Sequence, residues 1–311
     1  MPSESGQKSA SGAGKIELRR VLGYYLVTFL TTHALAAGYL LSGGSWRRLD
    51  SFAFANVLML VPGLVAAGCA RVLYREPVTR VLGLSLRKNR WFLFAWLLPV
   101  LLSGATLCVG LAMPGTAYSA ELAGLRARFD LNPEQLATLV HPLGSLPPIW
   151  TLLVQGLILG PTLSALAGLG EEAGWRGLLH RELRGLGFWR ESWCVGLLWG
   201  VWHLPLVFEG YGFPNHPFAG AALLMAFTVL AAPLYTFVRI RAESTLACAI
   251  FHGSFAASML LTFAPVAFGN ELTVGLLAVP GVLIMSLANV LLACLPARYR
   301  LPAAQESELS P

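Results

Sequence analysis

The chain has 311 residues, of which 56% are hydrophobic and only 12% are charged, and its mean hydropathy is +0.64. Soluble domains are about 45–50% apolar and about 25% charged, so this composition excludes an ordinary soluble protein and predicts one that crosses a membrane several times. The formal net charge of +6 does not indicate a nucleic-acid partner, because the basic residues lie in short segments beside apolar stretches, as membrane topology requires.

The N-terminal segment and the cysteines exclude two further classes. The first fifteen residues, MPSESGQKSASGAGK, are small and polar and contain no apolar segment of a cleavable secretory signal. We therefore expect a disordered cytoplasmic tail over residues 1–20. Five cysteines are scattered without CxxC or Cys/His spacing, which indicates neither a disulfide framework nor a structural zinc site.

Eight apolar stretches approach the length of about 20 residues that crosses a bilayer. They cover residues 21–41, 52–69, 91–113, 149–169, 193–207, 218–238, 246–268 and 272–295. With the N-terminus inside, all but four of the 22 basic residues lie in cytoplasmic segments; the four are Arg47, Arg48, Arg126 and Arg128. Because basic loops stay in the cytoplasm, we predict an all-α bundle of about eight transmembrane helices over residues 21–297, with a cytoplasmic C-terminal tail over 298–311.

Two local patterns refine this bundle. The longest outer loop, residues 114–148, contains SAELAGLRARFDLNPEQLATLV, whose helical spacing predicts an interfacial or lid helix. Within the spans, Gly and Ala gather in GLILG, SALAGLG and FAGAALL. Small residues of this kind let membrane helices approach closely.

Ionisable side chains inside the spans are few. Glu171 and Glu172 end the fourth span, His203 lies in the fifth, His252 in the seventh, and His33 in the first. Such groups are costly in a membrane and indicate function by default. Both aspartates fall in loops and no HExxH motif occurs, so an intramembrane aspartyl dyad and the usual helical zinc-protease signature are excluded.

The glutamates and histidines admit two interpretations. On a helix Glu172 and Arg176 are neighbours that can pair, while Glu171 is rotated by about 100°. A carboxylate of this kind can act as a general base toward water, and histidines on facing helices can orient that water, stabilise an oxyanion or bind a metal. The alternative is an interfacial ion pair with Trp175 as a membrane anchor, and packing roles for the histidines.

Three motifs in order resemble a known family. EEAGWRG, residues 171–177, is similar to the EExxxR motif of the CPBP family, the CAAX protease and bacteriocin-processing intramembrane endopeptidases. WGVWH, from Trp199 to His203, resembles its aromatic-xxx-His motif, and HGSFA, residues 252–256, resembles its HxxxN motif. The resemblance covers about residues 149–256 and predicts a protease core over about 149–268.

The resemblance implies an intramembrane cavity in which Glu171 and His203 activate a water and His252 helps to stabilise the oxyanion. Glu172 and Arg176, with Trp199, are expected to shape the site. Ala256 stands where the family commonly has Asn, which removes an oxyanion donor; loss of such a donor costs about 10²–10³ in rate. Ser254 and Ser258 are candidate replacements.

The resemblance leaves metal use open. Glu171, His203 and His252 are a donor set that suits Zn²⁺, whereas a glutamate-type enzyme of the family needs no metal. Neither the motifs nor their spacing decides between the two.

We therefore predict an endopeptidase of the bacterial plasma membrane that cleaves near the cytoplasmic side. Its expected substrate is a peptide or protein, either a lipidated CAAX-type substrate or another membrane-bound bacterial peptide. Two alternatives stay open: an immunity or scaffold protein that has lost activity at Ala256, and a proton-coupled transporter. Transport is favoured by inverted repeats, which the sequence does not show.

Overall fold

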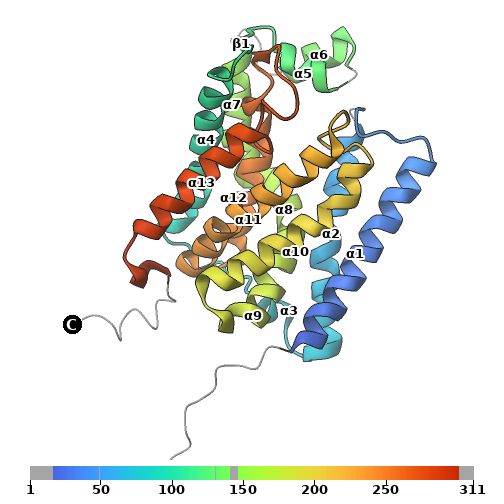
Figure 1. The fold of residues 1–311 in the computed structure, drawn as a ribbon. Coiled ribbons are helices and arrows are strands. Elements are labelled where there is room, and N and C mark those ends of the chain that lie inside the picture. Colours follow the sequence, from blue (N-terminus) through green and yellow to red (C-terminus); the bar gives the residue numbers. More distant parts are fainter. Residues whose placement is uncertain (1–16, 49, 130, 141–145, 301–311) are drawn as a thin grey trace, which may run out of the picture.

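The computed structural model describes residues 17–300 except 49, 130 and 141–145. The predicted tails therefore lie largely outside the described residues, although the first helix already begins at Leu18. The described chain is a membrane bundle of α-helices with one short two-stranded sheet (Figure 1).

The helices of the first half are α1 (Leu18–Leu41), α2 (Asp50–Cys69), α3 (Val78–Val81), α4 (Arg90–Leu111), α5 (Ala123–Arg128), α6 (Pro133–Val140) and α7 (Pro148–Leu159). Those of the second half are α8 (Ala165–Glu172), α9 (His180–Leu183), α10 (Phe188–Phe208), α11 (Pro217–Ala242), α12 (Thr245–Ser258) and α13 (Val279–Cys294). Three π-helical segments extend or join them: Ala70–Tyr74, Gly160–Ser164 and Ala173–Leu179. Short 3₁₀ turns cover Arg184–Leu186, Met259–Thr262 and Ala297–Arg300.

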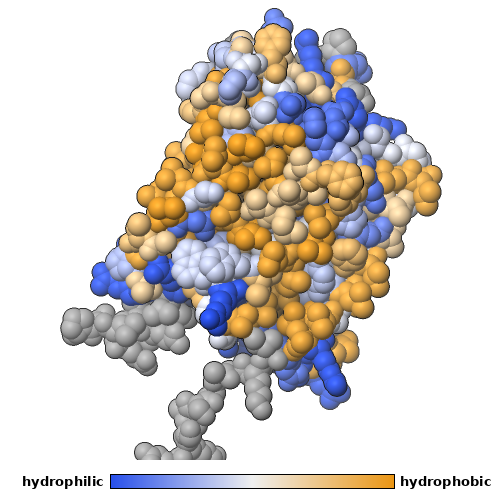
Figure 2. Space-filling model, in the orientation of Figure 1, coloured by the Kyte–Doolittle hydropathy of each residue, from blue (hydrophilic) through white to orange (hydrophobic). Residues whose placement is uncertain are grey.

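Six helical segments of the described chain are long and apolar enough to cross a membrane. They are Leu18–Leu41, Asp50–Tyr74, Arg90–Leu111, Pro148–Leu186, Pro217–Ala242 and Thr245–Thr262. Helix α10 covers the predicted fifth span and α13 is a shorter apolar helix. Figure 2 shows a broad apolar surface over the bundle, with hydrophilic residues gathered mainly toward its ends. The prediction of an all-α membrane bundle is confirmed.

The last two predicted spans were wrong at their facing ends. The seventh ends at Thr262 rather than residue 268, and the eighth begins in α13 at Val279 rather than residue 272. Between them Asn270 Oδ1 accepts hydrogen bonds from the backbone N–H groups of Leu272 and Thr273. Gly275 has φ +118°, a conformation that glycine adopts readily. Local turn chemistry therefore overrides the apolar composition.

The outer loop also differs from its prediction as one helix. Its helical pattern is divided into α5 and α6, which lie together at one end of the bundle (Figure 1). Ahead of them β1 (Ala117–Tyr118) pairs antiparallel with β2 (Val266–Ala267), with Ala117 opposite Ala267. Pro133 begins α6, since proline suits the first turn of a helix and stops one that precedes it.

Helix α12 is a central element of the bundle and packs against α4, α7, α8 and α11. Close approach to α8 depends on glycine, as predicted. A Cβ built on Gly168 would lie 3.1 Å from the Cβ of His252, and one on Gly160 would lie 2.8 Å from the Cα of Ser254. On the other face of α8, a Cβ on Gly170 would lie 2.4 Å from the carbonyl oxygen of Met59 in α2. These contacts hold the carboxyl end of α8 between α2 and α12.

A methyl group at Gly253 is expected to push α12 away from the segment before α8. Its Cβ would lie 2.3 Å from the carbonyl oxygen of Gly160 and 2.4 Å from the nitrogen of Ala165, so backbone must move. We expect Gly253→Ala to lower the thermal unfolding temperature of the detergent-purified protein. Gly104→Ala in α4 is the matched control, because nothing lies within 4 Å of its Cβ, and there alanine gains about 0.5–1 kcal/mol in helix propensity. Equal unfolding temperatures for the two variants would contradict this packing.

Candidate functional site

Glu171 is held by two tryptophans. It lies at the end of α8 and is 2% exposed. Its Oε2 accepts hydrogen bonds from the indole Nε1 of Trp199 in α10 at 2.6 Å and of Trp175 at 3.1 Å. The second oxygen, Oε1, has no hydrogen-bond partner among the described residues and belongs to a side chain that lines a cavity. The hydrogen bonds to Oε2 therefore fix the carboxylate, and Oε1 is free to accept a hydrogen bond or a proton.

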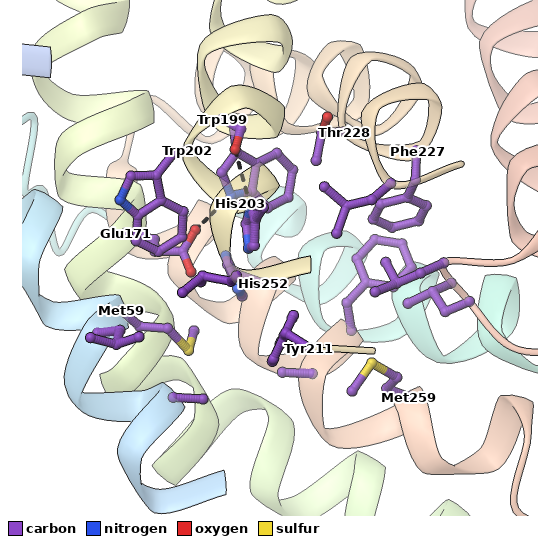
Figure 3. A pocket seen from close by; sticks show the side chains of 18 of the residues that line it. Met59, Glu171, Trp199, Trp202, His203, Tyr211, Phe227, Thr228, His252 and Met259 are labelled. Carbon is purple, nitrogen blue, oxygen red and sulfur yellow. Dashed lines mark hydrogen bonds between the residues drawn. The ribbon is translucent and has the colours of Figure 1, made fainter. Parts of the chain in front are cut away.

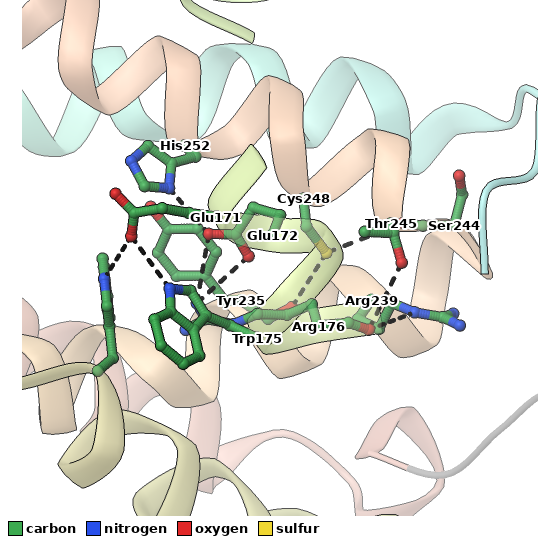
Figure 4. Close-up of polar contacts among 11 residues, drawn as sticks. Glu171, Glu172, Trp175, Arg176, Tyr235, Arg239, Ser244, Thr245, Cys248 and His252 are labelled. Atoms are coloured by element: carbon green, nitrogen blue, oxygen red, sulfur yellow. Dashed lines mark hydrogen bonds and ion pairs between the residues drawn. The ribbon is translucent and has the colours of Figure 1, made fainter. Parts of the chain in front are cut away.

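Glu172 is the partner of a histidine and an arginine. Its Oε1 lies 2.8 Å from Nδ1 of His252 and 3.3 Å from Nη1 of Arg176, whose Nη1 is also 3.2 Å from Oε2 (Figure 4). Because a carboxylate oxygen accepts, the Nδ1 of His252 donates, and its Nε2 remains available. Glu172 thus fixes the orientation of the His252 ring and keeps a proton on Nδ1.

Arg176 is enclosed by aromatic rings and backbone. Its Cζ lies 4.1 Å from the ring centroid of Tyr235 and 4.9 Å from that of Trp199, so both ring faces attract the guanidinium. Its carbonyl oxygen accepts a hydrogen bond from Nε of Arg239 at 3.1 Å. Glu172 is 0% exposed and Arg176 is 1% exposed. The ion pair lies inside the bundle.

The alternative of an interfacial ion pair with Trp175 as a membrane anchor is therefore wrong. Trp175 is 0% exposed and its indole donates to Glu171. Trp175 is the third residue of the π-helical segment Ala173–Leu179. A π-helical turn is wider than an α-helical one and is frequent at functional sites. Here the π-helical turn directly follows the two glutamates and carries two of their partners, Trp175 and Arg176.

His203 is fixed by its own helix. Its Nδ1 lies 3.0 Å from the carbonyl oxygen of Trp199, and because a carbonyl only accepts, Nδ1 carries the proton and Nε2 is free of it in the neutral ring. The ring contacts Trp202 edge-on at 4.7 Å and stacks at 6.4 Å on Tyr211. His33 stands apart from this group, with Nε2 at 3.1 Å from the carbonyl oxygen of Trp202, as expected of a packing residue.

One cavity joins the predicted site residues. It has a volume of about 130 Å³ and is lined by Glu171, His203 and His252 (Figure 3). Its walls are mainly aromatic and aliphatic: Trp46, Trp199, Trp202, Tyr211, Phe227, Tyr235 and Phe255 contribute, together with Ala256 and Thr228. A volume of this size holds several waters, since one water needs about 10–15 Å³ of such space. The structure thus places the acid of α8 and the imidazoles of α10 and α12 around one small cavity.

A second cavity of about 120 Å³ adjoins the first toward the loops. Trp46, Tyr211 and Met259 line both. The loops α1–α2 and α10–α11 that carry Trp46 and Tyr211 lie at the end of the bundle opposite the start of α1 (Figure 1). The second cavity therefore lies on the side of the site that faces that end.

The predicted replacements for the missing family Asn do not line the cavity. Ser258 Oγ bonds to the carbonyl oxygen of Ser254 at 2.6 Å and to Ser103 Oγ at 2.8 Å. Ser254 packs against Gly160 on another face of α12. Both expectations were wrong because helical rotation turns these residues away from the face shared by His252 and Ala256.

The sequence leaves metal use open and names Glu171, His203 and His252 as the ligands if a metal is bound. Among the described residues no three His, Cys, Asp or Glu side chains are arranged to hold a metal ion. Hydrogen bonds occupy Oε2 of Glu171 and Nδ1 of His252 and leave Oε1 of Glu171 and Nε2 of His252 without a partner in the described part of the chain. These residues as arranged do not fit a zinc ion.

Removal of Arg176 is expected to leave Glu172 as a buried uncompensated charge. Breaking a buried pair in this way costs about 3–5 kcal/mol. We expect Arg176→Met to lower the free energy of unfolding in detergent by about this amount, and Glu172→Met combined with Arg176→Met to recover part of the loss. Arg48→Met is the control, because its partner Asp50 is about half exposed and exposed pairs contribute little. If Arg176→Met were as mild as the control, the buried pair would not be a structural constraint.

Comparison with known protein families found a similarity over the segment that contains these site residues. The family model described as type II CAAX prenyl endopeptidase Rce1-like matches residues 148–258, from the start of α7 to the end of α12. A search of curated proteins found no significant match. The matched segment contains Glu171, His203 and His252 together with their partners, and over these residues the chain is similar to the Rce1-like family. The apolar helices of the described residues mark the chain as an integral membrane protein.

Proposed function

We propose that the protein is an intramembrane endopeptidase in which Glu171 activates a water for attack on a peptide bond. The observation that carries this proposal is the geometry of Glu171, with one carboxylate oxygen fixed by Trp175 and Trp199 and the other left beside a cavity shared with His203 and His252. A positioned carboxylate of this kind is suited to general-base catalysis. The Rce1-like family match supports the same class of reaction.

In the proposed reaction, water donates one hydrogen to Oε1 of Glu171 and the other to the unprotonated Nε2 of His203. Glu171 takes the first proton as the water oxygen bonds to the peptide carbonyl carbon, and the C=O π electrons move onto oxygen. His252, protonated at Nε2 with Glu172 as its counter-ion, donates to that oxyanion. The intermediate then collapses, the C–N bond breaks, and the nitrogen takes the proton held by Glu171.

We place this enzyme in the glutamate type rather than the metal-dependent type. Among the described residues, no three His, Cys, Asp or Glu side chains are arranged to hold a metal ion. Every proton in the proposed reaction moves between water, Glu171 and the leaving nitrogen. No step needs a Lewis acid.

The substrate is proposed to be a membrane-associated peptide or protein, of the prenylated CAAX type named by the family match. The aromatic and aliphatic walls of the cavity suit an apolar segment next to the cleaved bond. The adjoining cavity leads toward the end opposite the start of α1. With a cytoplasmic N-terminus, as predicted, this is the outer end, so we propose access from there instead of from the cytoplasmic side.

A non-enzymatic scaffold is the second candidate, because Ala256 lines the cavity without a donor where the family commonly has Asn. It keeps the buried network and lacks turnover. The two candidates differ only in whether the purified protein cleaves a peptide.

Substitution of Glu171 tests the proposed base. We expect Glu171→Gln to lower kcat for a quenched-fluorescence farnesylated CAAX peptide by about 10²–10⁴-fold, the usual contribution of general-base catalysis. His203→Ala is expected to lower kcat as well. Glu134→Gln on α6, an exposed position, should leave turnover unchanged. Full turnover by Glu171→Gln would refute the assignment, and absence of cleavage by the wild type would favour the scaffold.

Chelation separates the glutamate type from the metal type. We expect incubation of the purified protein with 1,10-phenanthroline, followed by its removal, to leave cleavage of the same peptide unchanged. An inactivation that added Zn²⁺ reverses would contradict the proposed glutamate mechanism. The non-chelating 1,7-phenanthroline is the control for direct effects on the detergent-bound protein.

A further inference from the structure

Tyr211 is one of the cavity residues whose polar group has no hydrogen-bond partner among the described residues; the indole Nε1 of Trp46 is another. It lies in the loop between α10 and α11, and its hydroxyl makes no hydrogen bond to any described residue. By contrast, Thr228, which also lines the cavity, already donates to the carbonyl oxygen of Met225 at 3.0 Å. A phenolic O–H without a protein partner is available to a ligand.

The backbone around Tyr211 aims it at the site. Gly210 and Gly212 flank it with φ +101° and +72°, conformations that other residues rarely adopt. The backbone N–H of Tyr211 donates to the carbonyl oxygen of Leu206 at 2.9 Å. Its ring stacks on His203 at 6.4 Å and meets Trp46 edge-on at 5.3 Å. Figure 3 shows it in the same group of side chains as His203 and His252.

The rest of the loop is tied down by Glu271. This carboxylate accepts from the backbone N–H of Asn215 at 2.8 Å and from Nδ1 of His216 at 3.1 Å. Partial burial opposes ionisation, but these hydrogen bonds outweigh it and hold the pKa of Glu271 below its ordinary value. The loop that carries Tyr211 is therefore anchored at its far end by a charged group.

Burial and the nearby Glu171 carboxylate raise the pKa of Tyr211 to about 12. The phenol thus keeps its proton at neutral pH and can act as a hydrogen-bond donor. Tyr235 also lines the cavity, but it is only 2% exposed and its ring face is occupied by the Arg176 guanidinium at 4.1 Å. Tyr211, at the junction of the two cavities, is better placed to meet an entering substrate.

We propose that the Tyr211 hydroxyl donates a hydrogen bond to the carbonyl oxygen of the cleaved peptide bond, in place of the donor missing at Ala256. This inference rests on the proposed function. The hydroxyl keeps its proton throughout. It donates a hydrogen bond to the oxygen that becomes the oxyanion, while the water activated by Glu171 attacks the carbonyl carbon. This hydrogen bond weakens again when the C=O bond reforms. Tyr211 is then a catalytic residue of the loop rather than of the bundle.

The first test is Tyr211→Phe, which keeps the ring and its contacts. We expect kcat for the farnesylated CAAX peptide to fall by about 10²–10³-fold, the usual loss for one oxyanion donor, with little change in KM. Tyr39→Phe is the matched control, because Tyr39 contacts Trp46 at 5.5 Å but its hydroxyl bonds to the carbonyl oxygen of Ser45. Wild-type kcat in Tyr211→Phe, or the large loss in Tyr235→Phe instead, would overturn the proposal.

The second test restores the missing donor. We expect Ala256→Asn to recover most of the kcat lost in Tyr211→Phe, because residue 256 lines the same cavity. A purely structural role for Tyr211 would not be rescued in this way. Failure of this rescue in a folded double variant, as judged by its unfolding temperature, would contradict a shared oxyanion role.

The third test does not depend on turnover. A phosphinate peptide imitates the tetrahedral intermediate, so its affinity should fall at least 10-fold in Tyr211→Phe, while binding of the uncleaved peptide to Glu171→Gln should be unaffected by adding Tyr211→Phe. If Glu171→Gln retains activity, the proposed function fails. If Glu171→Gln is inactive but phosphinate affinity is equal in wild type and Tyr211→Phe, only the Tyr211 proposal fails.

Discussion

Burial of two adjacent carboxylates is the constraint on which the rest of the structure depends. Glu171 and Glu172 are almost fully buried at the end of α8, where an unpaired charge is expensive. The chain satisfies them differently: indole N–H groups bind Glu171, while Arg176 and His252 bind Glu172. These partners come from α10, α12 and the π-helical segment after α8, so the packing of three elements is required at one point.

Close helix packing and local distortion meet this requirement. Glycines at 168 and 170 let α8 fit between α12 and α2, and a cavity of about 130 Å³ remains between the elements. The π-helical turn Ala173–Leu179 keeps Trp175 and Arg176 inside the bundle. Because so little space is left, a shift of one helix changes several polar contacts together, and this makes the site rigid.

Much of this arrangement follows from the sequence. The cost of charge in a membrane singled out Glu171, His203 and His252, and the structure brings all three to one cavity. Hydropathy predicted the helix bundle but misplaced the helix ends near residues 262 and 279. Between these residues an asparagine turn and a glycine with positive φ interrupt the helices. The indole donors were missed because tryptophan near a span end is ordinarily a membrane anchor. Tyr211 was missed because a loop residue has no periodicity that predicts its direction.

The indole clamp has one more consequence. The negative charge of Glu171 is balanced by neutral dipoles, whereas that of Glu172 is balanced by a guanidinium. Protonating Glu171 therefore separates no opposite charges, and the indoles stay in place in either state with little reorganisation. The two neighbouring carboxylates thus differ in their surroundings: uncharged indole donors hold the first, and a guanidinium ties the second to the aromatic core of the bundle.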